Sequence, residues 1–246
     1  MELSKTKTGV YSSLSSARMR RRHGLFIVEG EKSVRDTLGH FELECLICLK
    51  GCGDLPDVPA DKVREASEAD MKKISGLQTV PPVVAVYRIP RQEERPADVG
   101  RDLYLVLDGV QDPGNLGTIV RTCHWFGIRR IFASRDTADV FNPKCVQSTM
   151  GSIAKVEVTY CDLPALFSEN PSMPVYGLLL DGKDIFRAET GDCGFIVMGN
   201  EGNGISPEVR SHVTSPLLIP PATADHAESL NVAVATAITL ARFRGK

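Results

Sequence analysis

The chain has 246 residues, of which 42% are hydrophobic and 24% are charged, and its formal net charge is −2. Such a chain can form one large domain or two smaller domains with proper cores, and its composition is that of an ordinary globular enzyme. It contains neither an apolar run long enough to cross a membrane nor a signal peptide, so we expect a cytoplasmic protein with no membrane partner.

The N-terminal segment is strongly basic although the whole chain is not. Its first 24 residues contain a single acid, Glu2, and six basic residues: Lys5, Lys7, Arg18, Arg20, Arg21 and Arg22. A run of this kind is most simply a solvated helix face or a frayed tail. In a protein that acts on RNA, it would instead predict a phosphate-binding surface.

Residues 25–88 predict a small α/β unit. Strands are expected at 25–29, 43–49 and 83–89, with helices over 30–38 and near 68–75. The segment 90–100 has prolines and charges but no hydrophobic period, which indicates a linker. The cysteines at 45, 48 and 52 form the one cluster to test for metal, but Cys45 and Cys48 would point to opposite faces of a strand. We therefore expect no metal site.

From residue 103 the pattern becomes a regular alternation of strands and helices. Strands are expected at 103–107, 130–133, 155–158, 175–180, 195–198 and 216–219. Continuous apolar runs such as LYLVL and FIVM are typical of parallel strands that are covered on both faces. Ser206 and Pro207 have the residue types of an N-cap and a first helical position. An open α/β sheet is predicted, with its ligand at the carboxyl ends of the strands.

Three segments run from a buried strand into a polar loop and then into a helix. They are LVLDGVQDPGNLGTIVRTCHWFG at 105–127, FIVMGNEGNGIS at 195–206 and LIPPATADHAESLNVAVATAITL at 218–240. Their polar loops would meet at one edge of the sheet and form a composite site. A dinucleotide-binding Rossmann fold is disfavoured, because Gly199, Gly202 and Gly204 read G-x-x-G-x-G, the reverse of the required spacing.

These three segments, in this order, resemble the motifs of the SpoU (TrmH-type) family of RNA ribose 2′-O-methyltransferases in the SPOUT superfamily. The resemblance covers about residues 15–246. It implies a SPOUT methyltransferase domain at 102–246 with a mostly parallel sheet, flanking helices and a C-terminal trefoil knot. It also implies an N-terminal α/β RNA-binding domain at 1–89, with a linker at 90–101.

The resemblance also implies which residues form the site. The expected catalytic residues are Asn115, Arg121, Glu201, Ser229 and Asn231. The expected contacts to S-adenosyl-L-methionine are Leu180, Gly199, Asn200, Gly202, Ile219 and Leu230. The expected RNA contacts are Arg18, Arg20, Arg21 and Arg22.

Within this site, Glu201 is the expected ion-pair partner of Arg121, and Arg121 is expected to act electrostatically on the attacking ribose. His226 is expected to be a surface residue. Its loop, 221–227, is about two residues longer than the usual family spacing, which makes the cofactor contacts of this loop harder to assign.

The expected reaction is methyl transfer from S-adenosylmethionine to a ribose 2′-hydroxyl, with ribosomal RNA favoured over transfer RNA. Three alternatives stay open at this stage: the same reaction on transfer RNA, an RNA-binding SPOUT protein without catalysis, and methylation of a base. The apolar terminal helix 230–243 and the apolar residues around Trp125 further predict a homodimer through the C-terminal domain.

Overall fold

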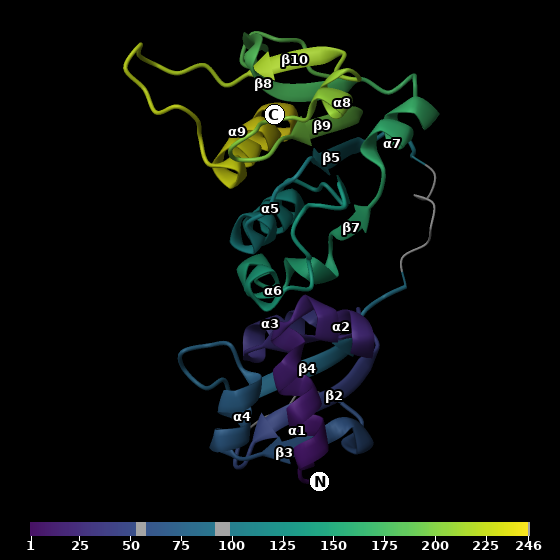
Figure 1. The fold of residues 1–246 in the computed structure, drawn as a ribbon, viewed down its shortest axis with the longest axis vertical. Coiled ribbons are helices and arrows are strands. Elements are labelled where there is room, and N and C mark those ends of the chain that lie inside the picture. The colour runs from purple at the N-terminus through teal and green to yellow at the C-terminus, as the bar shows by residue number, and fades with distance from the viewer. Residues whose placement is uncertain (53–57, 92–98, 246) are drawn as a thin grey trace. The chain divides into compact units, whose positions relative to one another are not determined.

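The computed structural model describes residues 1–52, 58–91 and 99–245 (Figure 1). The chain forms two compact units. Unit 1 comprises Met1–Arg91 and Asp139–Ala154, and unit 2 comprises Gln92–Ala138 and Lys155–Lys246. The segment 139–154 therefore groups with unit 1, although it lies inside the range 102–246 expected for one continuous domain. Most of the expected linker at 90–101 lies outside the described residues.

Unit 1 is built around a four-stranded sheet of order β1-β4-β2-β3. Strand β4 is antiparallel to both of its neighbours, whereas β2 and β3 are parallel. The strands are β1 Leu25–Glu29, β2 Leu43–Leu49, β3 Val63–Ala66 and β4 Val83–Arg88. The helices are α1 Lys5–Ser12, α2 Ala17–His23, α3 Glu31–Thr37, α4 Glu68–Ile74 and α6 Pro143–Thr149, with 3₁₀ turns at Ser13–Ser15, Ala60–Lys62 and Ser152–Ala154.

The core of unit 1 forms where helix residues cover the apolar faces of these strands. Tyr11 and Leu14 from the N-terminal helices pack with Ile27 of β1 and Ile47 of β2, and all four are almost fully buried. The strands expected at 25–29, 43–49 and 83–89 are therefore present, with the last ending one residue earlier. The sequence did not predict β3, whose four residues include Arg64 and Glu65 and show no apolar run.

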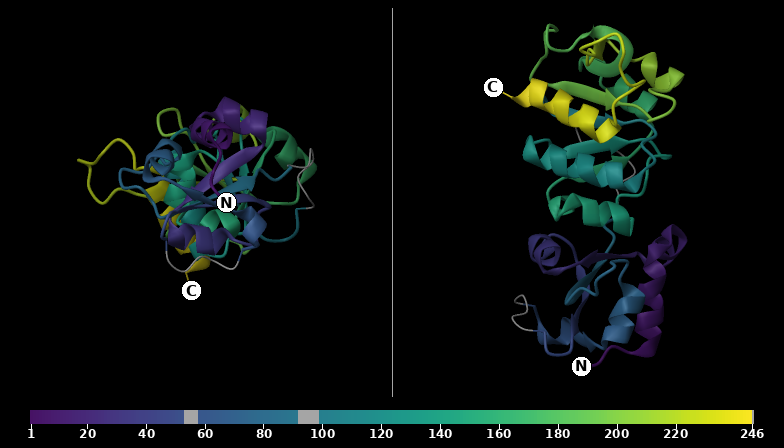
Figure 2. Two further views of the ribbon diagram at one scale, coloured as in Figure 1. Left: turned by 90° about the horizontal axis from the view of Figure 1, so that it is seen from below. Right: turned by 90° about the vertical axis from the view of Figure 1, so that its left-hand side faces the viewer.

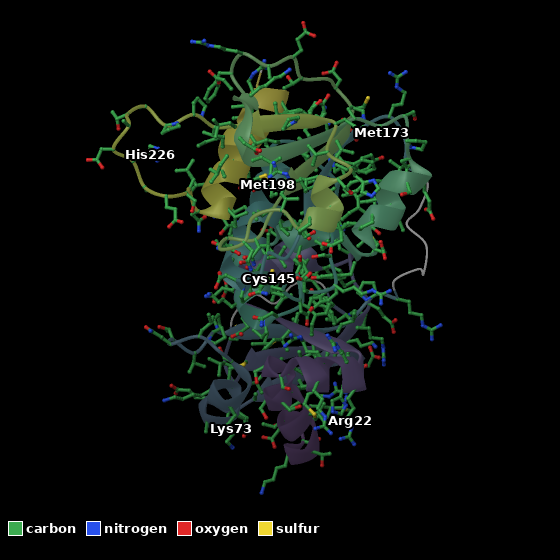
Figure 3. All side chains as sticks on the ribbon, turned by 45° about the horizontal axis from the view of Figure 1, so that its top comes forward. Arg22, Lys73, Cys145, Met173, Met198 and His226 are labelled. Carbon is green, nitrogen blue, oxygen red and sulfur yellow. The ribbon has the colours of Figure 1, made fainter. Side chains whose placement is uncertain are left out.

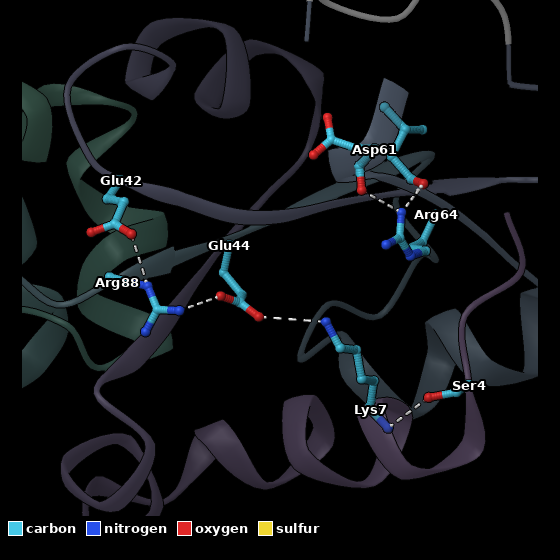
Figure 4. A network of polar contacts seen from close by, with 8 residues as sticks. Ser4, Lys7, Glu42, Glu44, Asp61, Arg64 and Arg88 are labelled. Atoms are coloured by element: carbon cyan, nitrogen blue, oxygen red, sulfur yellow. Dashed lines mark hydrogen bonds and ion pairs between the residues drawn. The ribbon is translucent and has the colours of Figure 1, made fainter. Parts of the chain in front are cut away.

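One polar network lies on the surface of unit 1 (Figure 4). Glu44 accepts hydrogen bonds from Lys7 Nζ at 3.4 Å and from Arg88 Nη2 at 2.7 Å, and Arg88 Nε also pairs with Glu42 at 3.0 Å. Exposed ion pairs of this kind add little stability. Lys7, one of the six basic residues of the N-terminal segment, is nevertheless paired with Glu44 in this network.

Unit 2 is built around a six-stranded parallel sheet of order β10-β8-β9-β5-β6-β7. The strands are β5 Leu103–Leu107, β6 Arg130–Ala133, β7 Glu157–Tyr160, β8 Val175–Asp184, β9 Gly194–Met198 and β10 Ser215–Leu218. The helices are α5 Pro113–Trp125, α7 Leu163–Glu169, α8 Pro207–Arg210 and α9 Val232–Arg244. The expected parallel α/β architecture is confirmed, and β7 begins two residues later than predicted.

The central strands β5 and β9 are buried on both faces, as their continuous apolar sequences predict. From β5 the chain moves to β6 and β7 on one side, whereas β9 lies on the other side of β5. The direction of strand progression therefore reverses between β5 and β9. Ligands of open α/β sheets bind at such reversal points, beyond the carboxyl ends of the strands.

Helices α5 and α9 pack against each other within unit 2 and lie side by side in Figure 1 and in the right-hand view of Figure 2. Each is capped by the side chain that precedes it. Asp112 accepts from Asn115 N at 2.8 Å, and Asn231 accepts from Ala233 N at 2.9 Å. Ser206 likewise caps α8, as its sequence predicts. No helix among the described residues is long and apolar enough to cross a membrane. Strand order does not establish a knot, so the trefoil knot stays a prediction.

Candidate active site

Three loops of unit 2 meet near the reversal point of the sheet. The first joins β5 to α5, the second joins β9 to α8, and the third joins β10 to α9. Hydrogen bonds of side-chain amides, carboxylates and backbone groups join these loops. These are the three polar segments that the sequence analysis singled out.

Asn115 is the point at which the three loops join. Its Nδ2 donates to Glu201 Oε1 of the second loop at 2.9 Å. Its Oδ1 accepts from Asn231 Nδ2, at the end of the third loop, at 3.0 Å. The sequence predicted that these three side chains would share one site, and the structure brings them into direct contact.

The orientation of the side-chain amides of Asn115 and Asn231 follows from the N-cap of α9. Asn231 Oδ1 accepts the N–H groups of Ala233 and Val234, at 2.9 and 3.3 Å, so the Nδ2 of Asn231 must face Asn115. Asn115 then presents its oxygen to Asn231 and its NH₂ group to Glu201. Because a carboxylate can only accept hydrogen bonds, this is the one arrangement that satisfies all three groups. Each NH₂ group keeps a second N–H for a ligand.

The second loop is held closed by close backbone packing and by Asn200. A Cβ on Gly199 would lie 2.3 Å from the carbonyl carbon of Gly204, so only glycine fits there. Asn200 Nδ2 donates to Gly109 O at 2.7 Å, and its Oδ1 accepts from Gly202 N and Asn203 N at 2.9 Å each. The backbone of Asn200 is also paired with Gly204.

Asp108 joins the first loop to the second. Its carboxylate is almost fully buried and accepts from Ser206 N at 2.7 Å, while its own N–H donates to Met198 O at 2.9 Å. Sequence reasoning missed this residue. The available signal was an acidic residue directly after the apolar strand LYLVL, where a buried carboxylate needs a partner.

The third loop extends away from the rest of unit 2, and His226 lies on it (Figures 1 and 3). Residues 221–231 are all exposed, so His226 is the surface histidine that the sequence predicted. The side chains within the loop make local hydrogen bonds, from Thr223 Oγ1 to Asp225 O and between His226 Nδ1 and Ala227 O. Leu230 leaves 49% of its surface exposed, which is unusual for a leucine.

Comparison with known proteins assigns this arrangement to a family. The profile of the SpoU rRNA methylase family matches residues 102–241, and that of an MRM3-like substrate binding domain matches residues 10–85. The chain is 30% identical to the 23S rRNA (guanosine(2553)-2′-O)-methyltransferase RlmP of Bacillus subtilis, over 96% of this chain and 94% of that protein.

The chain belongs to the SpoU rRNA methylase family.

Solved structures agree. A TrmH-family protein from Porphyromonas gingivalis has a TM-score of 0.90 at 38% identity, over 100% of this chain and 99% of that one. An AdoMet-bound rRNA methyltransferase from Sinorhizobium meliloti has a TM-score of 0.86 at 26% identity, over 100% of this chain and 97% of that one. The predicted SpoU resemblance is thereby confirmed.

Arg121, the first-motif arginine of this SpoU chain, lies on α5 with an exposed side chain. The expected ion pair with Glu201 is wrong, because Glu201 accepts from Asn115 instead. Within the part of the chain that the structure describes, the exposed Arg121 side chain makes no hydrogen bond or ion pair. Its guanidinium therefore keeps all of its donors for a ligand.

His124 lies one turn beyond Arg121, on the same helix. Partial burial, together with Arg129 and Lys155, lowers the pKa of its imidazole below the ordinary value. The lowered pKa favours the neutral form of the ring.

The expected cofactor residues occupy two kinds of environment. Leu180 and Leu230 expose 76% and 49% of their surfaces, whereas Ile219 is half-buried after β10. The N–H of Gly202 is taken by Asn200. Asn200 itself uses its side chain and backbone to hold the loop, which leaves it a supporting role.

Ser229, one of the expected catalytic residues, is exposed on the third loop.

Arg20 corrects the expected RNA-binding set. It is 1% exposed, and its guanidinium binds Asp139 Oδ2 through Nη2 at 2.6 Å and Nε at 3.0 Å. A buried and paired guanidinium is not free to bind RNA phosphate. The remaining members, Arg18, Arg21 and Arg22, are exposed on α2, and Figure 3 labels Arg22.

Proposed function

We propose that this SpoU-family protein transfers a methyl group from S-adenosylmethionine to a ribose 2′-hydroxyl of ribosomal RNA. The observation that carries the proposal is the contact of Asn115 with both Glu201 and Asn231, which unites the three family motifs at the carboxyl end of the sheet. The name of the B. subtilis relative states a 2′-O-methyltransferase of 23S rRNA. The N-terminal substrate-binding profile supports an RNA substrate.

The residues present fit S-adenosylmethionine. An adenine needs an apolar wall and backbone polar groups, and the exposed side chains of Leu180 and Leu230 offer such a wall. Gly199 has no side chain, and the backbone of Gly204 and Ile205 packs directly against it, which fixes the second loop beside the proposed cofactor site. When bound, this cofactor supplies a methyl group that is already activated by its sulfonium. The protein then has to position the two reactants and manage the hydroxyl proton.

Arg121 has the chemistry to stabilise the attacking oxygen. Its guanidinium stays charged at ordinary pH, so it serves as a fixed positive charge beside the 2′-oxygen and the adjacent phosphate rather than as a base. Asn115 orients the ribose through its second N–H group, and Ser229 with Asn231 shapes the loop beside the methyl group. No group of three or more His, Cys, Asp or Glu side chains in the described residues is arranged to hold a metal ion.

We further propose that unit 2 forms a homodimer through α5 and α9. Trp125, at the end of α5, leaves 84% of its surface exposed, and Val234 on α9 leaves 49% exposed. These helices pack against each other, so the two side chains belong to one helical layer. Large exposed apolar side chains on such a layer fit a second copy of the chain. Sedimentation that shows an active monomer of 26.8 kDa would contradict this proposal.

The exposed arginines of α2 are the proposed RNA contacts. Arg18, Arg21 and Arg22 stand at positions i, i+3 and i+4, so they share one face of the helix. Replacing all three with alanine should raise the RNA dissociation constant and reduce the log–log salt slope by roughly one unit per lost phosphate contact. Cofactor affinity should stay unchanged. An unchanged RNA affinity would exclude this face. The cytoplasmic location stays a prediction.

The decisive experiment incubates the purified protein and methyl-labelled S-adenosylmethionine with ribosomal RNA or with transfer RNA. Label in nuclease-resistant 2′-O-methyl dinucleotides from ribosomal RNA is the expected result. Label confined to transfer RNA would identify transfer RNA as the substrate instead. Label on a nucleobase would contradict methylation of the ribose. Cofactor binding without any transfer would favour an RNA-binding protein that does not catalyse the reaction.

A further inference from the structure

We propose that Asp108 is a positioning residue for cofactor binding, whose carboxylate holds the second loop of the site, residues 199–206, in the conformation that receives S-adenosylmethionine. This proposal rests on the function proposed above. It assigns a role to a buried carboxylate that directly follows β5 and that neither the expected catalytic residues nor the expected cofactor contacts include.

The second loop is closed on itself by hydrogen bonds. The N–H of Asn200 donates to Gly204 O at 2.9 Å, and the N–H of Gly204 donates to Asn200 O at 3.0 Å. Asn200 Oδ1 also accepts the N–H groups of Gly202 and Asn203. Residues 200–204 therefore form one small hydrogen-bonded body, and the place of this body beside the sheet depends on how its two ends are attached.

Two consecutive residues of the first loop hold the two ends of the second. At the start of the second loop, Gly109 O accepts from Asn200 Nδ2 at 2.7 Å. At its end, Asp108 Oδ2 accepts from Ser206 N at 2.7 Å. Residues 201–204 between these attachments are exposed, so no packing on their outer side holds them in place.

The first loop is a rigid support for these attachments. The N–H of Asp108 donates to Met198 O at 2.9 Å and so continues the pairing of β5 with β9. The N–H of Gly109 donates to Ser134 Oγ at 2.8 Å. A Cβ on Gly109, whose φ is +74°, would lie 3.2 Å from Asp136 Oδ2. The strand β9 and the loop after β6 thus fix the residues that hold the second loop.

The chemistry of Asp108 suits a directional attachment. Its side chain is 8% exposed, and burial of a carboxylate costs desolvation free energy unless hydrogen bonds compensate it. A hydrogen bond to an ionised acceptor is shorter and stronger than a neutral one, as the 2.7 Å contact with Ser206 N illustrates. The neighbouring Ile205 side chain is also buried in the core, but apolar packing has no preferred direction. The carboxylate therefore orients the backbone where the loop ends.

This orientation bears on cofactor affinity because the expected cofactor contacts Gly199, Asn200 and Gly202 all lie in the second loop. Without the carboxylate, the loop keeps its attachment at Gly109 and can turn about it. If about a tenth of the molecules then hold the competent conformation, the apparent affinity falls about tenfold. Bound cofactor selects the competent conformation, so saturating cofactor restores it.

Asp108→Ala removes the acceptor. We expect the dissociation constant of S-adenosylmethionine, measured by calorimetry, to rise about tenfold. The single-turnover rate at saturating cofactor and ribosomal RNA should stay within about threefold of the wild-type rate, since the cofactor restores the loop. Asp108→Asn should bring the cofactor affinity back to within about threefold of the wild-type value, because an amide oxygen still accepts from Ser206 N.

Ser206 offers a matched pair of variants on the donor side of the same bond. Ser206→Pro removes the N–H, and the φ of −60° at this position suits a proline ring. Ser206→Ala keeps the N–H and removes only the hydroxyl that caps α8. The dissociation constant of the cofactor should rise about tenfold in Ser206→Pro and stay at the wild-type value in Ser206→Ala. Asp108→Ala combined with Ser206→Pro should add no further loss, because both remove one bond.

Wild-type cofactor affinity in folded Asp108→Ala would overturn the proposal, even with a lowered thermal midpoint, because that is the result of a purely structural role. If Asp108→Ala does not fold, the Ser206 pair decides, and equal affinities of Ser206→Pro and Ser206→Ala would overturn the proposal. Failure of the proposed function is distinguishable, because the wild-type protein itself would then bind no S-adenosylmethionine or transfer no methyl group.

Discussion

Two substitutions of Asn231 separate its role as a helix cap from its role in the site. In Asn231→Ala both are lost. The N–H groups of Ala233 and Val234 lose their acceptor, which costs about 1 kcal/mol of stability and lowers the thermal midpoint by roughly 2–4 °C for a domain of this size. Asn115 also loses a neutral hydrogen bond of about 1 kcal/mol, which corresponds to roughly fivefold in turnover if that bond orients the ribose.

Asn231→Asp keeps the cap and removes the donor. A carboxylate caps a helix as well as an amide does, and its charge is favourable at a helix N-terminus, so the thermal midpoint should hold or rise slightly. The side chain of Asn115 would then lie between two carboxylates, that of Glu201 and the one introduced at position 231. Its NH₂ group faces Glu201, so its oxygen would face the new carboxylate without a donor between them. Turnover at saturating substrates should fall by about fivefold to tenfold.

The assay pairs thermal unfolding with turnover on ribosomal RNA, and calorimetry measures cofactor affinity. An Asn231→Asp enzyme that keeps full turnover would refute the ordered amide chain. An Asn231→Ala protein with an unchanged midpoint would refute the cap.

Other substitutions test neighbouring parts of the site. Arg121→Ala should lower turnover by on the order of a hundredfold with cofactor binding largely kept, and Arg121→Lys should restore little, because a lysine lacks the planar fork. Near-normal turnover at saturating RNA would instead direct attention to His124 and His226 as proton acceptors. Gly199→Ala should abolish cofactor binding measured by calorimetry, since its Cβ would overlap the backbone of the second loop; retained binding would disprove the close packing. Trp125→Glu should shift the protein towards monomer in sedimentation, and an unchanged oligomeric state would place the interface elsewhere.

The elements that the sequence predicted well are those with strong local signals. The central strands β5 and β9 are continuous apolar runs that both faces of the sheet can bury. Ser206 with Pro207 marked the start of α8 through cap chemistry. Strand β3 was missed because it is short, charged and paired at one edge of its sheet.

The candidate site was likewise predicted only in part. The pattern of strands and loops predicted one composite site, because the carboxyl ends of parallel strands meet at one edge, and the resemblance to the SpoU family implied Asn115, Glu201 and Asn231 as its residues. It did not reveal which side chains bond to each other, and the expected pair of Arg121 with Glu201 was wrong. That pairing depends on the cap of α9, which orients Asn231 and then Asn115.

The sequence by itself determined the apolar strands, the cap at Ser206 and the order of the three motif loops, because each depends on residues close together in the chain. Only the tertiary structure decided that Arg20 is buried while its neighbours on α2 are exposed, and that residues 139–154 complete unit 1. A run of basic residues at helical spacing does not say which face will meet a carboxylate far along the chain. Burial of the guanidinium costs desolvation free energy, and this cost is offset only where packing brings Asp139 against Arg20.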